Sequence, residues 1–393
     1  MGKLNQCVAD MKHYAPIVLL LALCNSLWGQ ADSGSKNASP FTYSILYKGD
    51  WVSSFKGGVK SGSSYAGIAT AHLAFDLEKA RWWKGGLLQV YLSNTHGQQP
   101  SERLVGAYQA VSNIEAGNRT FFQEFWFEQT VGQLSLKLGI QDLNVEFSAN
   151  DFGSSFINSS FGIQSTFNDN LPASIFPVTG FGGILKWSIS AMHTAKIGLF
   201  EGNPSCLSID PWVFRIPFFE KSGTLNIFEY SYSGAIPVGA NGFYKLGMYY
   251  HNHTSPAQAA DTNHAGHNYG FYFVGNQPLY RRSDHSSLNL FTQLSLSPIK
   301  QSSNHLYWGV GLSYKGPSWH VPDELGLAFA QARFNESNAP LESVWECFYR
   351  YSFGQYFYLQ PSAQYIVNPM RFGYPLNDAF LAIVRFGFHF EPR

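Results

Sequence analysis

The feature that most limits the fold is a recurring segment of about ten residues in which apolar and polar side chains alternate. In 133–143 the two faces carry Leu134, Leu136, Leu138 and Ile140 against Ser135, Lys137, Gly139 and Gln141. The segments 243–250, 306–314 and 380–390 show the same pattern, and in 306–314 the face opposite Leu306, Trp308 and Leu312 is expected to carry small residues. A period of two places each set on one side of a β-strand.

We count about sixteen such segments, and Gly, Asn, Asp, Ser or Pro ends each one. The expected strands are 41–55, 64–76, 86–94, 120–129, 133–142, 182–190, 194–200, 223–232, 242–251, 268–277, 286–296, 306–315, 324–334, 343–353, 356–367 and 379–390. An even number of strands is typical of barrels formed by a single bacterial chain.

The composition distinguishes a membrane barrel from a soluble β-sandwich, which shows the same alternation. Only 13% of the 393 residues are charged and 17% are aromatic, whereas a soluble domain is about 25% charged. After residue 30 no apolar run approaches the ~20 residues of a membrane-spanning helix. The sequence therefore predicts an all-β fold: a transmembrane antiparallel β-barrel that occupies residues 41–393.

The N-terminus has the pattern of a secretory signal. Lys3 and Lys12 precede an apolar core at 16–23, and small residues follow at 29–31. We expect residues 1–31 to be a cleaved signal peptide and 32–40 to be a polar linker. Export to the outer membrane would bring the barrel into contact with lipid and lipopolysaccharide.

The lengths of the connections also favour a barrel. If the C-terminus faces the periplasm, the long connections at 95–119, 144–180, 201–222, 252–267 and 335–342 all lie on the outer side. Those at 130–132, 191–193 and 354–355 are short and lie on the inner side. This asymmetry is expected of outer-membrane barrels.

Several functional classes lack support in the sequence. The net formal charge is zero and no large basic patch is present, which argues against nucleic-acid binding. No motif indicates a cofactor, and neither a nucleophile elbow nor an HExxH motif supports an outer-membrane hydrolase. The histidines in 251–267 form an incomplete metal pattern and are more simply explained as a polar loop. Whether Cys206 and Cys347 form a disulfide stays open.

The longest outer connection, 144–180, is the main candidate for function. It contains Asn144, Glu146, Asp151 and Asp169 and no Lys or Arg, and Asp142 precedes it. An irregular segment of this length needs a packing partner. We expect it to fold into the lumen, where its carboxylates and amides would hydrogen-bond solute hydroxyls. The alternative is an external loop that packs against a neighbouring subunit.

Charged residues of the wall form the second group of candidates. The alternation predicts that the following residues face inward: Lys137, Lys245, Glu346, Arg350, Arg385 and His389. Opposite an acidic loop they would create a transverse field across the pore. The simpler interpretation is that they only solvate a polar lumen.

An aromatic candidate lies in 121–128, where alternation places Trp126 with Glu124 and Glu128, opposite Gln123. A ring beside carboxylates can stack on a sugar while the carboxylates bind its hydroxyls. The alternative is a tryptophan at the rim of the barrel.

Several blocks of the chain, in the same order, resemble the carbohydrate-selective porin family OprB. They are GIQDLNVEFSANDFGSSFINSSFGIQSTF (139–167), NGFYKLGMYYH (241–251), YGFYFVGNQPLYR (269–281), GLSYKGPSWHVPDELGLAFA (311–330) and YFYLQPSAQYIVNP (356–369). The resemblance implies a sixteen-stranded outer-membrane barrel, usually trimeric, that passes monosaccharides such as glucose, polyols and related small solutes. A general, weakly selective porin is the alternative function.

The sequence departs from the family pattern at three places. Gln141 stands where the family usually has a basic residue, and Trp319–His320 replace a common Gly–Arg pair. The chain also continues through 391–393 beyond Phe390, where such barrels usually end at an aromatic residue.

Overall fold

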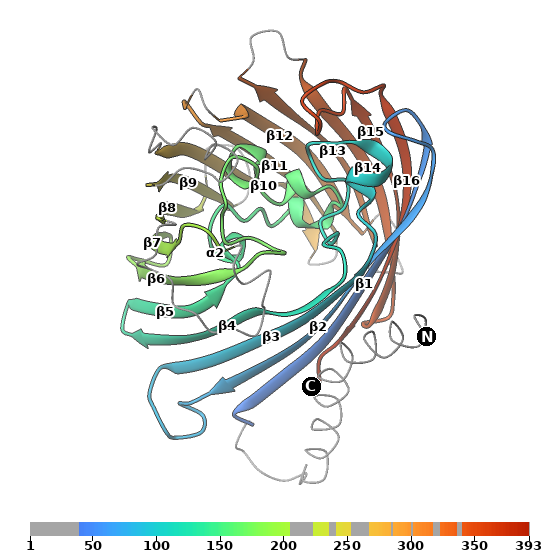
Figure 1. Cartoon of the computed structure of the whole chain (residues 1–393). Coiled ribbons are helices and arrows are strands. Elements are labelled where there is room, and N and C mark those ends of the chain that lie inside the picture. The colour runs from blue at the N-terminus through green and yellow to red at the C-terminus, as the bar shows by residue number, and fades with distance from the viewer. Residues whose placement is uncertain are drawn as a thin grey trace, which may run out of the picture.

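A computed structural model describes residues 39–204, 223–235, 241–252, 267–283, 286–299, 302–316, 323–335 and 340–392. Within these ranges sixteen antiparallel strands form one closed barrel, and β1 pairs with both β2 and β16 (Figure 1). The strands are β1 Phe41–Lys56, β2 Gly62–Asp76, β3 Gly86–Gly97, β4 Arg119–Val131, β5 Leu134–Gln141, β6 Gly180–Ser188, β7 His193–Glu201, β8 Thr224–Gly234, β9 Gly242–His251, β10 Asn268–Ser283, β11 Ser286–Leu296, β12 Asn304–Lys315, β13 Asp323–Phe334, β14 Glu342–Phe353, β15 Phe357–Val367 and β16 Ala379–Phe390. The predicted fold and number of strands are confirmed.

The outer face of the barrel carries the predicted apolar side chains. Leu134, Leu136 and Leu138 are exposed on β5, whereas Ser135 and Lys137 are buried on the opposite face. On β9, β12 and β16 the exposed residues include Leu246, Met248, Trp308, Leu312, Phe380, Val384 and Phe386. A continuous apolar outer face fits a barrel surrounded by lipid.

Ile140 keeps the register of Leu134, Leu136 and Leu138 in its pairing with β4 and β6, as predicted, although it is buried. Two details of the predicted alternation are wrong. Tyr307 is fully buried in β12, where only small inward residues were expected. Gln123 lines the interior together with Glu124 because a register shift in the β3–β4 pairing, opposite Tyr91 and Leu92, adds one residue to β4.

Two long connections fold into the barrel. One runs from Asp142 to Thr179 and contains α2 Leu143–Glu146, η3 Gly153–Ser155, η4 Ser159–Phe161 and α3 Ser165–Asn168. Its Ser155 hydroxyl donates to Glu324 of β13 at 3.0 Å, and its Ile157 N–H donates to Glu346 of β14 at 2.7 Å. Because β5 and β14 are far apart around the barrel, this segment crosses the interior, as predicted for 144–180.

The other inward connection is 98–118, which contains η2 Ser101–Val105. The lengths of the connections predicted it on the outer side, and no residue of it was a candidate for function. It is joined to the first by the N–H of Asn113, which donates to the carbonyl of Ile157 at 2.9 Å. The N–H of Ser159 donates to the carbonyl of Ala110 at the same distance of 2.9 Å. We call 98–118 the first inner loop and 142–179 the second inner loop.

An apolar core inside the barrel holds the second inner loop against the wall. Phe156 and Phe161 are fully buried and contact Phe291 of β11, and Phe156 also meets Phe348 of β14 edge-on. Gly326 makes room for the Phe348 ring, because a Cβ there would lie 2.2 Å from it. Part of the barrel interior is therefore packed like the core of a soluble domain.

Some predictions fall outside the described residues. They concern the signal peptide 1–31, most of the linker 32–40, Cys206, Trp319–His320 and most of 251–267. No helix among the described residues is long and apolar enough to cross a membrane. Of the histidines in 251–267, His251 is buried and hydrogen-bonds the carbonyl of Gly202 at 2.7 Å.

Candidate functional site

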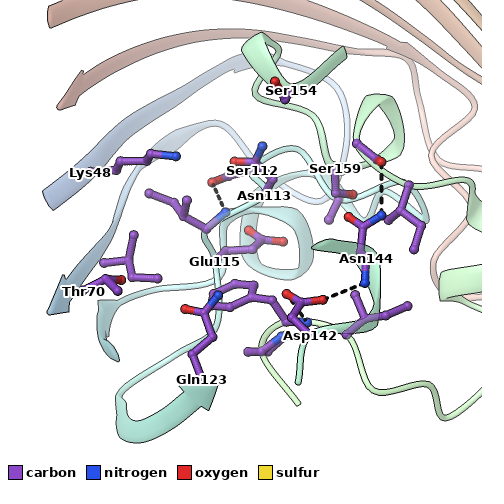
Figure 2. Close-up of a pocket in the computed structure, with 18 of the residues that line it drawn as sticks. Lys48, Thr70, Ser112, Asn113, Glu115, Gln123, Asp142, Asn144, Ser154 and Ser159 are labelled. Atoms are coloured by element: carbon purple, nitrogen blue, oxygen red, sulfur yellow. Dashed lines mark hydrogen bonds between the residues drawn. The ribbon is translucent and has the colours of Figure 1, made fainter. Parts of the chain in front are cut away.

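A cavity of about 700 Å³ with polar and apolar lining lies between the wall formed by β16 and β1–β4 and the two inner loops (Figure 2). Its volume is within the range of pockets that hold small ligands. The wall contributes Ser44, Leu46, Lys48, Ile68, Thr70, His72, Tyr91, Gln123 and His389. The inner loops contribute Gln99, Glu102, Ala110, Ser112, Asn113, Ile114, Glu115, Asp142, Asn144, Ser154, Ser159, Gly162, Ile163, Asn168, Ile175, Phe176 and Pro177, and Arg371 completes the lining.

Lys48 is the distinctive cation of the cavity wall. It extends from β1 toward the first inner loop (Figure 2). It makes no hydrogen bond or ion pair with another residue in the described part of the chain. Its ammonium group is therefore available to a solute.

The carboxylates of Glu115 and Asp142 face the cavity from the two inner loops. The Ser101 N–H donates to Glu115 at 3.0 Å, and the Asn144 N–H donates to Asp142 at 3.0 Å, which caps α2. Burial raises the pKa of Glu115 to about 7 and that of Asp142 to about 6. Both groups therefore change charge within the pH range in which bilayer recordings are made.

Two further parts of the cavity lining also carry polar side chains. Glu102 and Arg371 form an ion pair of 3.4 Å that is largely exposed to water. Near the strand ends that carry the termini, His72 stacks on Tyr91 with ring centroids 4.2 Å apart and hydrogen-bonds Gln89 at 3.1 Å. Groups that bind hydroxyls or ions thus extend along the whole cavity.

Of the residues that the sequence suggested, Asp142, Asn144 and His389 line this cavity. Glu124, Trp126 and Lys137 lie together on the wall, and Lys137 joins them to Glu146 of the second inner loop. The Trp126 N–H donates to Glu124 at 2.7 Å, and the Lys137 ammonium lies 4.0 Å from the Trp126 ring and pairs with Glu146.

The Lys137–Glu146 pair extends into a larger network that includes Lys196, which lies 3.6 Å from Glu146 and 3.2 Å from Glu229. Burial acts to raise the pKa of Glu146, but Lys137 and Lys196 outweigh burial and lower it. Glu146 therefore keeps its charge, and this network holds α2 against the wall.

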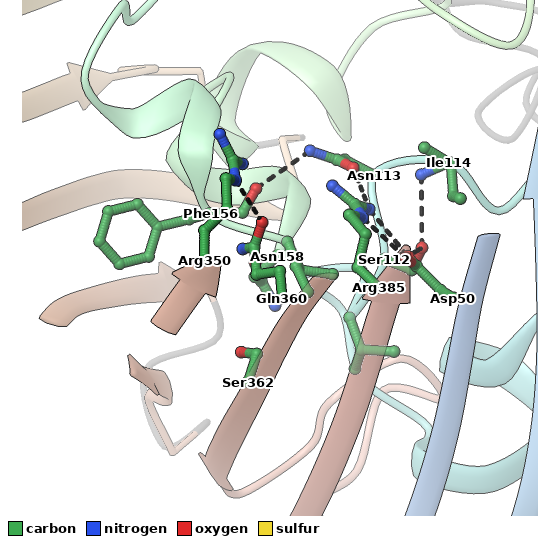
Figure 3. A network of polar contacts seen from close by, with 12 residues as sticks. Asp50, Ser112, Asn113, Ile114, Phe156, Asn158, Arg350, Gln360, Ser362 and Arg385 are labelled. Atoms are coloured by element: carbon green, nitrogen blue, oxygen red, sulfur yellow. Dashed lines mark hydrogen bonds and ion pairs between the residues drawn. The ribbon is translucent and has the colours of Figure 1, made fainter. Parts of the chain in front are cut away.

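Four further candidates contact the inner loops from the wall. Lys245 donates to the carbonyl of Ala149 at 2.6 Å, and Glu346 accepts from Ile157. Arg350 donates to the carbonyl of Ser155 at 3.1 Å, and Arg385 donates to Asn113 at 2.7 Å (Figure 3). These four residues lie on the inner face, as predicted, but outside the lining of the cavity.

The last two candidates, Asp151 and Asp169, are exposed on the second inner loop. Asp169 accepts from the Asn168 side chain at 3.2 Å. Neither residue belongs to the lining of the cavity. A role in solute passage for these two residues, and for the eight others outside the lining, stays a prediction.

Sequence reasoning missed Lys48, Ser112, Asn113, Glu115 and Gln123, all of which line the cavity. Lys48 had a visible signal, because it is a charged residue inside an alternating strand. Simple alternation predicted Gln123 on the outer face, and this was wrong because the register shift in β4 turns it inward. Ser112, Asn113 and Glu115 lie in the first inner loop, whose inward course depends on contacts with residues distant in sequence.

A closed barrel with an apolar outer face, inward-folded loops and an interior cavity lined by charged and polar side chains is typical of the class of outer-membrane channels. The sequence comparison then identifies the family, because residues 60–390 match the model of the carbohydrate-selective porin family, OprB. The chain belongs to this family. It is thus a carbohydrate channel of the outer membrane of a Gram-negative bacterium.

Solved structures support the fold. The chain is similar to the high-pH structure of Pseudomonas putida OprB, with a TM-score of 0.79 and 20% identity over 89% of this chain and 94% of that one. For the low-pH structure of the same protein the TM-score is 0.58 and the identity 17%, over 89% and 93% of the two chains. No curated protein matches the sequence.

Proposed function

We propose that monosaccharides and polyols cross the barrel by passive diffusion through the cavity between β1–β4 and the inner loops, without chemical conversion. The observation that carries this proposal is the opposition of Lys48 on the wall to Glu115 and Asp142 on the loops. The ammonium group donates hydrogen bonds and the carboxylates accept them, and a sugar hydroxyl does both. Amides and hydroxyls of Asn113, Asn144 and other lining residues add to both kinds.

Binding in such a passage is expected to be weak. A channel needs sites that are favourable enough for a solute to enter and weak enough for it to leave. Because the lining mixes donors and acceptors rather than one rigid set, it suits neutral polyhydroxylated solutes. Millimolar block by a sugar such as glucose would therefore be consistent with fast passage.

The proposal is tested by reconstituting the purified protein in planar bilayers. We expect open channels whose current glucose reduces at millimolar concentration. Replacing Glu115 by Gln should weaken this block about tenfold, because a hydrogen bond to a charged group contributes about 1.5–3 kcal/mol. Glu78→Gln is the matched control, since Glu78 lies in the turn between β2 and β3 and does not line the cavity.

Silent membranes, or block that Glu115→Gln leaves unchanged, would contradict the proposed route. Liposome swelling distinguishes selectivity from simple sieving. Equal swelling rates for sugars and unrelated solutes of the same size would favour a general porin instead.

The ion preference of the channel should depend on pH. At pH 8 both Glu115 and Asp142 are charged, and they outnumber Lys48. As the pH falls to 5, below their pKa values of about 7 and about 6, they become neutral and the cavity becomes net positive.

We therefore expect the reversal potential in a KCl gradient to shift toward anion preference between pH 8 and pH 5. A Glu115→Gln/Asp142→Asn double variant should lose most of this shift, because it removes the two carboxylates that titrate in this range. A shift of the same size in the double variant would show that other groups control the ion preference.

Three further proposals rest on the sequence and on the family. We propose that residues 1–31 direct export and are removed, that the barrel contacts lipid and lipopolysaccharide, and that it assembles as a homotrimer. Cross-linking of the protein in native outer membranes, followed by mass measurement, tests the assembly and the processing together.

A further inference from the structure

Two glutamates on the inner face of β14 accept hydrogen bonds from backbone N–H groups of the inner loops. Glu346 accepts the N–H of Ile157 at 2.7 Å with one carboxylate oxygen and the N–H of Asn158 at 2.8 Å with the other. The side chains of Gln364 and Ser362 also donate to it, at 3.0 and 3.3 Å. Glu346 is fully buried and lies outside the cavity lining.

Glu342 makes the same kind of contact with a different part of the interior. It accepts the N–H groups of Tyr108 at 2.8 Å and Gln109 at 2.7 Å from the first inner loop. It also accepts the N–H of Met370 at 2.7 Å, from the connection between β15 and β16. It too is fully buried, and four residues along a strand place it about 13 Å from Glu346.

The segments that these glutamates hold form one unit. The Asn113 N–H donates to Ile157 and the Ser159 N–H donates to Ala110, both at 2.9 Å. Residues next to the held positions line the cavity, among them Ser112, Asn113 and Ser159. The positions of the Glu342 and Glu346 carboxylates therefore fix how far the inner loops stand from the β1–β4 wall.

A carboxylate suits this task because both of its oxygens accept hydrogen bonds. A glutamine of the same shape presents an NH₂ group in place of one oxygen, and that group opposes a backbone N–H. At Glu346 the substitution would leave at least one buried N–H without an acceptor, which destabilises the held position of the loop. The loop can satisfy that N–H again by moving toward water in the passage.

We propose that Glu342 and Glu346 are positioning residues that set the width of the passage and thereby its selectivity. They act through the inner loops and do not touch the solute. This assignment rests on the proposed function, and it replaces the solute-contacting role that the sequence suggested for Glu346.

The test compares Glu346→Gln, Glu342→Gln and the double variant with wild type in planar bilayers. The matched control is Glu128→Gln, because Glu128 is a wall carboxylate of β4 that hydrogen-bonds Ser135 of the neighbouring strand. Single-channel conductance without sugar should rise about twofold in the double variant, since the narrowest section limits conduction. Larger neutral polyethylene glycols should enter the variant pore, and glucose block should weaken.

Glu346→Asp separates positioning from a general need for charge. It keeps two acceptor oxygens but is one methylene shorter, so we expect conductance and block between those of wild type and Glu346→Gln. A purely structural role would lower the yield of folded barrels and leave the conductance of those that form unchanged, and that result would overturn the proposal. Failure of all the variants to form barrels would overturn it too.

The proposed function and this assignment can be rejected independently of each other. Conductance and polymer exclusion are measured without sugar, so they report the loop position even if glucose does not block the wild-type channel. Wild-type conductance and exclusion in both glutamine variants would reject the positioning role while leaving the sugar route intact.

Discussion

Replacing Asp50 by Ala is expected to lower the free energy of unfolding by about 3–5 kcal/mol, because it removes the carboxylate that neutralises the buried Arg385. Both residues lie inside the barrel and are almost completely buried. The guanidinium group donates to both oxygens of Asp50 at 2.7 Å, and the Ser112 hydroxyl donates to Asp50 at 2.6 Å (Figure 3).

The measurement is denaturant unfolding of the detergent-solubilised protein, followed by tryptophan fluorescence. The double variant Asp50→Leu/Arg385→Met should regain most of the loss, because well-packed apolar residues often replace a buried ion pair without cost. Glu102→Ala is the control, since the exposed Glu102–Arg371 pair should contribute less than about 1 kcal/mol. A loss of similar size in Glu102→Ala would contradict this distinction between buried and exposed pairs.

The same network connects stability with the passage. Arg385 also donates to the Asn113 side chain at 2.7 Å, and Asn113 and Ser112 line the cavity. β1 and β16 pair with each other to close the barrel, and Asp50 and Arg385 face each other in this pairing. The same two side chains bind the first inner loop. Closure of the barrel and placement of the loop are coupled through one ion pair.

The barrel itself was predictable from the sequence because its physical cause is local. Period-two alternation identifies the outer face of β5, β9 and β16 without any knowledge of which strands are neighbours. The strand ends differ by a few residues, as at β10, which runs to Ser283 rather than to residue 277. Such ends depend on pairing with β9 and β11 rather than on the segment alone.

The site was less predictable because it depends on contacts between distant residues. The sequence indicated that the second inner loop enters the lumen, and this is where the structure places it. It did not indicate that the two inner loops would cover Lys137, Glu346 and Arg385. An inward-facing charge on a strand has the same sequence pattern whether it meets water or a loop carbonyl. Only the packed structure separates loop anchors from residues that line the passage.

This separation explains why one lysine of the wall matters more than its neighbours. Lys137 pairs with Glu146, and Lys245 donates to the carbonyl of Ala149, so each serves the second inner loop. Lys48 faces the cavity without a hydrogen-bond or ion-pair partner in the described part of the chain. Its charge therefore acts on the solution in the passage rather than on the fold.

Replacing Lys48 by Glu should accordingly make the channel strongly cation-selective with little effect on stability. The cavity would lose the lysine of its wall, and a fourth carboxylate would join those of Glu102, Glu115 and Asp142. A unit charge about 4 Å away changes the energy of an ion by about 1 kcal/mol in water, and the reversal changes the charge by two. Because salt screens part of this effect, we expect the potassium-to-chloride permeability ratio to rise about tenfold.

The permeability ratio follows from the reversal potential in a KCl gradient at pH 7, where Lys48 is charged and Asp142 is mostly ionised. Lys48→Met should give an intermediate ratio, because it removes one charge rather than reversing it. Lys84→Glu makes the same charge reversal in the exposed turn between β2 and β3 and should leave the ratio near that of wild type. If Lys84→Glu shifted the ratio as much as Lys48→Glu, ions would not be passing between β1–β4 and the inner loops, because of these two lysines only Lys48 faces that route.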